Sequence, residues 1–314
     1  HFDTMKVEQV GEDRVYVSDC RGSSPPSTHK VCVNTLGAYK QSIEVLLTGL
    51  DIEKKAEIYV DQIFHNLGGK EQFTDVDIHL IRSDKEDPAS NEEAHAALRI
   101  TITSDDPSKL GRLLQAKVTE LGLAAIPGNT GRGAAGYNGN PVIAYWPTLI
   151  DSRKVTERVH INGDLIEVLP TQRLGLEERY YQEVPVKIPP APGGDTTRIP
   201  FGRLFGTRSG DKGGAANCGV WAKTDEAFGF LHEFLTVEKF KELAPDMASY
   251  KIERFDLPNL RALNFYIHDV LGEGVSSNHR IDKQAKSLCE YLRAKTIEAP
   301  TLLVDQIART NLNE

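Results

Sequence analysis

The densest group of chemically useful side chains lies between residues 207 and 217. Its polar members, which alternate with glycines, are Arg208, Ser209, Asp211, Lys212 and Asn217. Glycine allows positive φ and brings backbone N–H groups close to a ligand, while arginine and lysine suit carboxylate or phosphate groups. Because loops on a rigid scaffold commonly carry sites, we expect a functional loop between two strands.

Within this expected loop, Asp211 is flanked by cations. It should therefore stay ionised, and it can act as a base or orient Lys212. Arg208, Ser209 and Asn217 are the expected substrate-binding side chains. The alternative is a loop that an internal network of Arg, Asp and Lys fixes for structural reasons alone.

A second group of polar side chains lies on the strand predicted over residues 262–269. Alternation along a strand places Asn264, Tyr266 and His268 on one face and apolar residues on the other. We expect Asn264 to bind substrate and His268 to act as an acid–base group near neutral pH. The alternatives are a face that is merely solvated and a structural histidine.

The loop over residues 127–140 is rich in glycine and contains Arg132. It has neither the GxxxxGK[ST] of a P-loop nor a GxGxxG that opens a helix, so no motif indicates nucleotide binding. We expect Arg132 to help hold an anion such as a coenzyme A phosphate. A mobile lid and a plain connection are the alternatives.

Motifs for nucleophilic or metal catalysis are missing from the sequence. There is no GxSxG elbow, and His232-Glu233 lacks the second histidine of HExxH because Thr236 stands there. The cysteines are Cys20, Cys32, Cys218 and Cys289. Without a CxxC pair they are expected to be free thiols in a reducing compartment. We predict no metal and no cofactor, apart from coenzyme A as part of a substrate.

Composition limits the classes of partner. The 314 residues carry a formal net charge of −8, which leaves no basic surplus for nucleic acid. No apolar run approaches the roughly 18 residues of a membrane helix, and the first twenty residues lack a signal-peptide core. We expect a soluble cytoplasmic protein, with an organellar matrix as the alternative in a eukaryotic host.

Hydrophobic periodicity predicts strand, helix, strand, strand, helix and strand in the first half of the chain. The expected ranges are 30–47 (one or two strands), 52–67, 75–82, 97–103, 107–121 and 142–146. This order is the split βαβ or ferredoxin-like plan, with two helices on one face of an antiparallel sheet.

Prolines and paired glycines then prevent regular structure over a linker. Beyond it we expect strands at 199–206 and 216–223, helical segments over 225–243, strands at 250–255 and 262–269, and a helix over 281–292. The predicted class is α+β with two ferredoxin-like domains, residues 1–168 and 199–314, joined by the linker 169–198.

The stretch from Gly202-Arg203-Leu204 through Arg208-Ser209-Gly210-Asp211-Lys212-Gly213 to Asn217-x-Gly219-Val220 resembles the signature of the AtuA family, the acyclic terpene utilisation protein A family. Further similar stretches are 11–22, 146–149, 264–272 and 280–292. The resemblance spans nearly the whole chain. It implies a ferredoxin-like domain at the end, preceded in full-length members by a larger α/β portion, so this chain is expected to begin part-way into the pattern.

The resemblance also implies degradation of acyclic terpenes or branched acids through coenzyme A thioesters. We expect an enzyme that hydrates, dehydrates or cleaves an acyl-CoA or carboxylate substrate. Asp211 would be the base, Arg208 and Lys212 would hold the oxyanion or carboxylate, and His268 would relay protons. The rival is a non-catalytic assembly or accessory subunit of an acyl-CoA-processing complex. In both cases a homo-oligomer is expected, together with association with a separate N-terminal AtuA portion.

Overall fold

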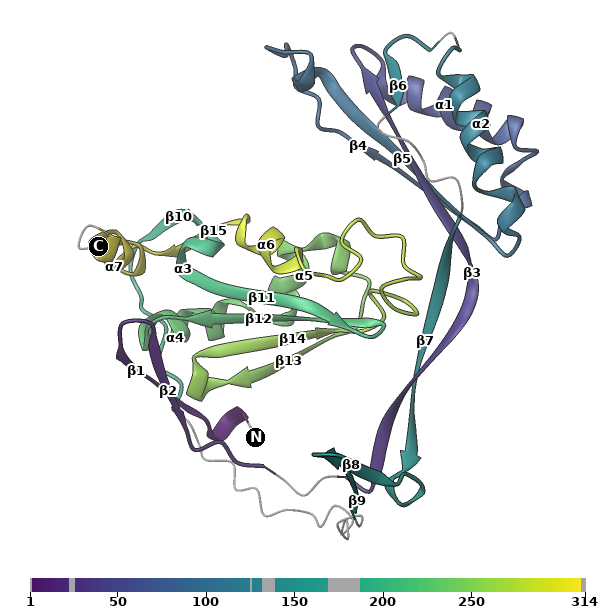
Figure 1. The fold of residues 1–314 in the computed structure, drawn as a ribbon. Helices are drawn as coiled ribbons and strands as arrows, with labels where there is room; N and C mark the ends of the chain where they lie inside the picture. The colour runs from purple at the N-terminus through teal and green to yellow at the C-terminus, as the bar shows by residue number, and fades with distance from the viewer. Residues whose placement is uncertain (1, 23–25, 125, 132–138, 169–186, 312–314) are drawn as a thin grey trace. The chain divides into compact units, whose positions relative to one another are not determined.

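The computed structural model describes residues 2–22, 26–124, 126–131, 139–168 and 187–311. The chain forms two compact units, one made of residues 34–144 and the other of residues 1–33 together with 145–314. Two long strands, β3 (Thr28–Thr48) and β7 (Asn140–Asp151), carry the chain between the units (Figure 1). The division therefore does not follow a single cut in the sequence.

The smaller unit contains an antiparallel sheet with the strand order β4-β5-β3-β6, and β7 also pairs with β3. Its remaining elements are α1 (Ile52–Asn66), β4 (Asp75–Ile81), β5 (His95–Ser104), α2 (Arg112–Leu121) and β6 (Asn129–Gly131). Along the chain this gives strand, helix, strand, strand, helix, strand. The predicted split βαβ plan is confirmed for this unit.

The two helices of the smaller unit pack on one face of this sheet. Apolar side chains of α1 at helical spacing, among them Ile52, Tyr59 and Ile63, join Leu98 and Ile100 of β5 in a single core. Tyr59 is fully buried, and its hydroxyl has no hydrogen-bond partner among the residues that the structure describes. Burial raises the pKa of Tyr59 to about 12.

The larger unit is built on an antiparallel sheet with the strand order β11-β12-β14-β13. Its strands are β11 (Phe205–Lys212), β12 (Ala215–Ala222), β13 (Ile252–Leu257) and β14 (Ala262–Ile267). The helices are α3 (Phe201–Leu204), α4 (Asp225–Phe234), α5 (Val237–Leu243), α6 (Leu288–Arg293) and α7 (Thr301–Asn311). Apolar residues of α3 to α6 share one core with one face of the sheet, so helices cover that face.

Three further strand pairs belong to the larger unit. They are β1 (Lys6–Gly11) with β2 (Arg14–Ser18), β8 (Glu157–Ile161) with β9 (Asp164–Val168), and β10 (Thr196–Pro200) with β15 (Thr296–Pro300). Before β10, Ile188 already packs against the core of this unit.

Short 3₁₀ helices occur in both units, at Phe2–Thr4, Lys70–Gln72, Glu92–Ala94, Pro107–Lys109, Ser152–Lys154, Pro245–Met247 and Pro258–Leu260.

Two predicted elements of the second half were wrong in their bounds. The strand expected over 199–206 is divided among β10, α3 and the start of β11, and the helix expected over 281–292 begins only at Leu288. The carboxylate of Asp282 accepts hydrogen bonds from the backbone N–H groups of Lys286 and Ser287, each at 2.8 Å. Such side-chain bonds compete with helical ones and hold a turn there.

The prediction of four free thiols was also wrong. Cys218 of β12 and Cys289 of α6 form a disulfide, with their Cα atoms 6.0 Å apart. Seventy-one positions separate them in sequence, so only the docking of α6 on the sheet brings them together. Cys20 and Cys32 are exposed and keep their thiols.

Candidate functional site

The segment expected to be a functional loop is mainly strand. Arg208, Ser209, Asp211 and Lys212 all belong to β11, which pairs in register with β12 from Phe205↔Ala222 to Lys212↔Ala215. The turn is confined to Gly213 and Gly214, where Gly213 has a φ of 68°. The glycines of this segment therefore lie both in the turn and within the paired strands, where they leave room for neighbouring side chains.

Alternation along β11 divides the predicted site residues between two faces of the sheet. Phe205 lies in the helix-covered core, so Ser209 and Asp211 share its face. Arg208 and Lys212 lie on the opposite face, together with their exposed neighbour Trp221 of β12. The pleat of the strand thus points Arg208 and Lys212 away from Asp211, and the expected cluster of the three side chains does not form.

The face of Arg208 is the one that gathers the other predicted residues, and we call it the polar face. Strand register places Asn217 of β12 beside Tyr266 of β14, and Gly219 beside Asn264. The amide of Asn217 donates from Nδ2 to Oδ1 of Asn264 at 3.1 Å. Asn217, Asn264 and Tyr266 are half-buried, which leaves polar atoms accessible on a rigid surface.

His268 completes the polar face just after β14 and forms a dyad with Glu253 of β13. Its Nε2 lies 2.6 Å from Oε2 of Glu253, and its ring packs edge-on against Tyr266 at 4.8 Å between centroids. Hydrogen bonds from His268 and then from Lys251 hold the pKa of Glu253 below its ordinary value. A carboxylate only accepts, so Nε2 carries the proton shared with Glu253, and in the neutral form of the ring the lone pair is on Nδ1.

Sequence reasoning missed Glu253. Part of its signal was available, because alternation over the expected strand 250–255 places Glu253 on the face opposite Ile252. What the sequence does not contain is the register Glu253↔Tyr266, which places the carboxylate within reach of His268. The register between the consecutive strands β13 and β14 decides this contact.

The helix-covered face gives Ser209 and Asp211 different neighbours. Ser209 is 5% exposed, and its hydroxyl accepts from the N–H of Cys289 at 3.1 Å and donates weakly to the carbonyl of Lys286 at 3.5 Å. Asp211 lies 4.0 Å from Nζ of Lys286. Both predicted site residues therefore contact the segment that leads into α6.

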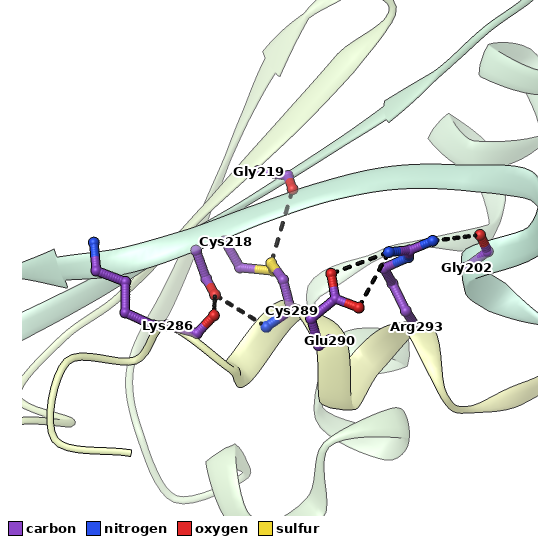
Figure 2. Close-up of polar contacts among 8 residues, drawn as sticks. Gly202, Cys218, Gly219, Lys286, Cys289, Glu290 and Arg293 are labelled. Carbon is purple, nitrogen blue, oxygen red and sulfur yellow. Dashed lines mark hydrogen bonds and ion pairs between the residues drawn. A yellow bond between two sulfur atoms is a disulfide. The ribbon is translucent and has the colours of Figure 1, made fainter.

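Figure 2 shows how α6 is held against the sheet, with Cys289 joined to Cys218 near the start of the helix. At the other end of α6, Arg293 contacts Glu290 at 3.1 Å and donates to the carbonyl of Gly202 at 3.1 Å. These contacts fix the helix at both ends. Lys286, two residues before the helix, lies beside β11 as well, because its carbonyl accepts the hydrogen bond from Ser209.

Lys212 is exposed and donates from Nζ to the neighbouring carbonyl of Asp211 at 3.0 Å. Arg208 is exposed as well, and no hydrogen bond or ion pair joins its guanidinium to any residue that the structure describes. Arg132 lies outside the described residues, so its expected contact with an anion stays a prediction.

Neither a metal centre nor a membrane span is visible in the described part of the chain. Its residues contain no group of three or more His, Cys, Asp or Glu side chains placed to hold a metal ion. Over the same residues, no helix combines the length and apolar character needed to cross a membrane.

Comparisons with known proteins identify two regions of the chain. Residues 1–161 match the model of the acyclic terpene utilisation family protein AtuA, and residues 199–298 match the model of the AtuA ferredoxin-like domain. The second match coincides with the sheet that carries the polar face. No curated protein and no solved structure matches the chain.

Proposed function

The chain belongs to the acyclic terpene utilisation family AtuA, and from this premise we propose that it is an acid–base enzyme of acyclic terpene or branched-acid breakdown. The substrate would be an acyl-CoA or a carboxylate, and the reaction a hydration, a dehydration or a carbon–carbon lyase step. The observation that carries the proposal is the His268–Glu253 dyad on the polar face.

The dyad supplies a base with a defined tautomer. Because Glu253 accepts the proton of Nε2, the lone pair of Nδ1 is available for the proton on the carbon α to a thioester carbonyl. In a dehydration, the electron pair of that C–H bond forms the double bond and the hydroxyl on the β carbon leaves. The proton taken by His268 leaves with it as water.

Negative charge develops on the carbonyl oxygen during this step, and hydrogen-bond donors on the polar face are needed to stabilise it. Asn217 gives one amide hydrogen to Asn264, which leaves its second hydrogen and the amide group of Asn264 for a substrate oxygen. Arg208 lies in the register row of Asn264, two residues along the strands from Asn217. The two amides support a role in holding a thioester oxyanion, and Arg208 supports one in holding a carboxylate or a phosphate of the substrate.

This assignment moves the base from Asp211 to His268. Asp211 faces the helices and contacts Lys286, whereas His268 shares a face with Arg208, Asn217 and Asn264. A role for Asp211 in the reaction stays a prediction, which an isosteric variant of this carboxylate can test.

The experiment is turnover of branched 3-hydroxyacyl-CoA and 2-enoyl-CoA thioesters by His268→Gln. The matched control is His232→Gln, because His232 also pairs with a carboxylate, Asp256 Oδ2 at 2.8 Å, but lies on α4. Removing a general base costs roughly 10²–10⁴-fold in kcat. We expect that loss for His268→Gln alone; equal activity of the two variants would refute the proposal.

A non-catalytic assembly module is the second candidate. It is favoured by the apolar side chains that the two-stranded hairpins β1–β2 and β8–β9 expose, among them Val7, Val15, Ile161 and Ile166. Two-stranded hairpins are marginally stable alone and gain from a partner surface. Light scattering together with a thioester-binding assay separates the candidates: assembly without ligand binding supports the module.

A further inference from the structure

Along one side of the edge strand β11, an aromatic ring and three cations follow one another. The order is Trp221 over Gly206, then Arg208, then Lys286 over Gly210, then Lys212. Alternate strand residues are about 7 Å apart, so the four groups are regularly spaced. We propose that this row, Trp221–Arg208–Lys286–Lys212, binds the adenine nucleotide head group of a coenzyme A thioester.

Trp221 provides the stacking surface. The indole lies directly over the backbone of its register partner Gly206, so closely that a Cβ there would overlap the ring. The residue nevertheless remains 42% exposed. A ring with one side fixed by a glycine and the rest accessible is the kind of platform on which a purine stacks.

Arg208 provides the first anion-binding group. Its guanidinium is exposed, and no described residue neutralises it through a hydrogen bond or an ion pair. It is a diagonal neighbour of Trp221 on the same face, within the reach of long side chains. An unpaired guanidinium beside an aromatic platform matches a phosphate attached to a purine ribose.

Lys286 and Lys212 extend the row of positive charge. An ideal Cβ at Gly210 would lie 3.1 Å from Nζ of Lys286, so the ammonium stands over Gly210, between Arg208 and Lys212. Lys286 contacts Asp211 only at 4.0 Å, and Lys212 donates to a backbone carbonyl. Both ammonium groups keep hydrogens for phosphate oxygens.

The head group of coenzyme A fits this row by its chemistry. It has one adenine ring, a 3′-phosphate and a diphosphate, which match one aromatic platform and three cations. Two glycines make room for this row: Gly206 allows the indole to pack on the strand backbone, and Gly210 leaves space for the ammonium of Lys286. The inference deepens the proposed function, on which it rests for the acyl chain, by selecting thioesters over free carboxylates.

The test follows ligand binding through the intrinsic fluorescence of Trp221. The chain has two tryptophans, so Trp146→Phe leaves Trp221 as the single one. Titration with coenzyme A should quench its fluorescence to saturation. Dephospho-coenzyme A, which lacks the 3′-phosphate, should bind at least tenfold more weakly. Pantetheine and ATP are the comparison ligands and should bind weakly or not at all.

Variants of the row identify the contributing groups. In the Trp146→Phe background, Arg208→Ala and Lys286→Ala should each weaken coenzyme A binding tenfold or more. Lys241→Ala on α5 is the control, because it removes a positive charge from a helix on the covered side of the sheet. Gly206→Ala should displace the indole and abolish quenching. If Gly206→Ala fails to fold, Arg208→Ala still tests the row, because Arg208 is exposed.

Several results would overturn the inference. They are equal coenzyme A affinity in Arg208→Ala and the parent, binding of pantetheine as tight as that of coenzyme A, and binding of ATP as tight as that of coenzyme A. His268→Gln separates this inference from the proposed function, since it should bind coenzyme A normally while losing turnover. Turnover of free carboxylates without any coenzyme A binding would refute the inference and leave the acid–base proposal intact.

Discussion

The hydroxyl of Ser209 accepts a hydrogen bond from the backbone N–H of Cys289 at 3.1 Å, on the buried side of β11. The first N–H groups of a helix have no partner within it, so Ser209 gives the start of α6 an acceptor from the sheet. The disulfide to Cys218 fixes the same point covalently. The buried side of β11 thereby positions Lys286, whose ammonium reaches the polar face.

Replacing Ser209 by alanine should lower the free energy of unfolding by about 1–3 kcal/mol, because a buried N–H loses its acceptor. Thr207→Val is the matched control. Thr207 lies on the same face of β11, and its buried hydroxyl has no hydrogen-bond partner in the described part of the chain, so its loss should be neutral or stabilising. Urea denaturation of both variants measures the difference. Equal destabilisation would mean that the Ser209 hydrogen bond contributes nothing.

The Cys218–Cys289 disulfide should contribute about 4 kcal/mol to stability, as chain-entropy estimates give for a loop of 71 residues. Cys218→Ser with Cys289→Ser should lose that amount, whereas Cys20→Ser with Cys32→Ser should lose little, since those thiols are exposed. Thiol titration of the unfolded, unreduced protein should find two groups, and four after reduction. Four groups before reduction would contradict the pairing.

Glu253→Gln and Asp211→Asn are isosteric changes that separate the two candidate carboxylates. Glu253→Gln should reduce kcat by one to two orders of magnitude, because an amide can also donate to Nε2 and no longer fixes the tautomer of His268. Asp211→Asn should leave kcat within about threefold, because it loses only a 4.0 Å contact with Lys286. The reverse ranking in steady-state kinetics would restore Asp211 as the base.

The buried phenol of Tyr59 should make the smaller unit sensitive to alkali. Its folded pKa of about 12 lies above the ordinary value of 10.0, so the folded state holds the proton more tightly. Stability linked to this group is complete below pH 10 and is lost as pH rises through 12. Tyr59→Phe should abolish that loss. Near neutral pH its free energy of unfolding should match or exceed that of the wild type, because no described residue hydrogen-bonds the hydroxyl.

Urea denaturation at pH 7 and pH 11, followed by circular dichroism, measures this effect. Lys70, whose ammonium lies 5.3 Å from the ring centroid of Phe64, is a second ionisable side chain of this unit. Lys70→Gln is therefore the control for a general alkaline effect. An unchanged alkaline loss in Tyr59→Phe would assign it to other groups.

Much of the architecture follows from local patterns in the sequence. The 3.6-residue spacing in α1 and the alternation in β14 depend only on neighbouring residues, so both were predictable. The same holds for the face shared by Asn264, Tyr266 and His268, whose strand neighbours Leu263, Phe265 and Ile267 are fully buried. The order of elements in the smaller unit followed from these periods.

The glycine-rich segment shows where local patterns fail. Its glycines predicted a loop, yet eight consecutive pairs with β12 make it a strand up to Lys212. Strand formation here depends on hydrogen bonds to another segment, which composition does not encode. Once the strand forms, its pleat places Arg208 and Asp211 on opposite faces, an outcome that a loop does not require.

By itself, then, the sequence determined the family, the α+β class and the polar alternation of β14. Only the tertiary structure decided which side chains meet: Glu253 with His268, Ser209 with Cys289, and Lys286 with Gly210. The physical reason is the distance along the sequence over which each feature is decided. Side-chain direction repeats over two or four residues, whereas these contacts depend on strand register and helix docking between segments 15 to 80 positions apart.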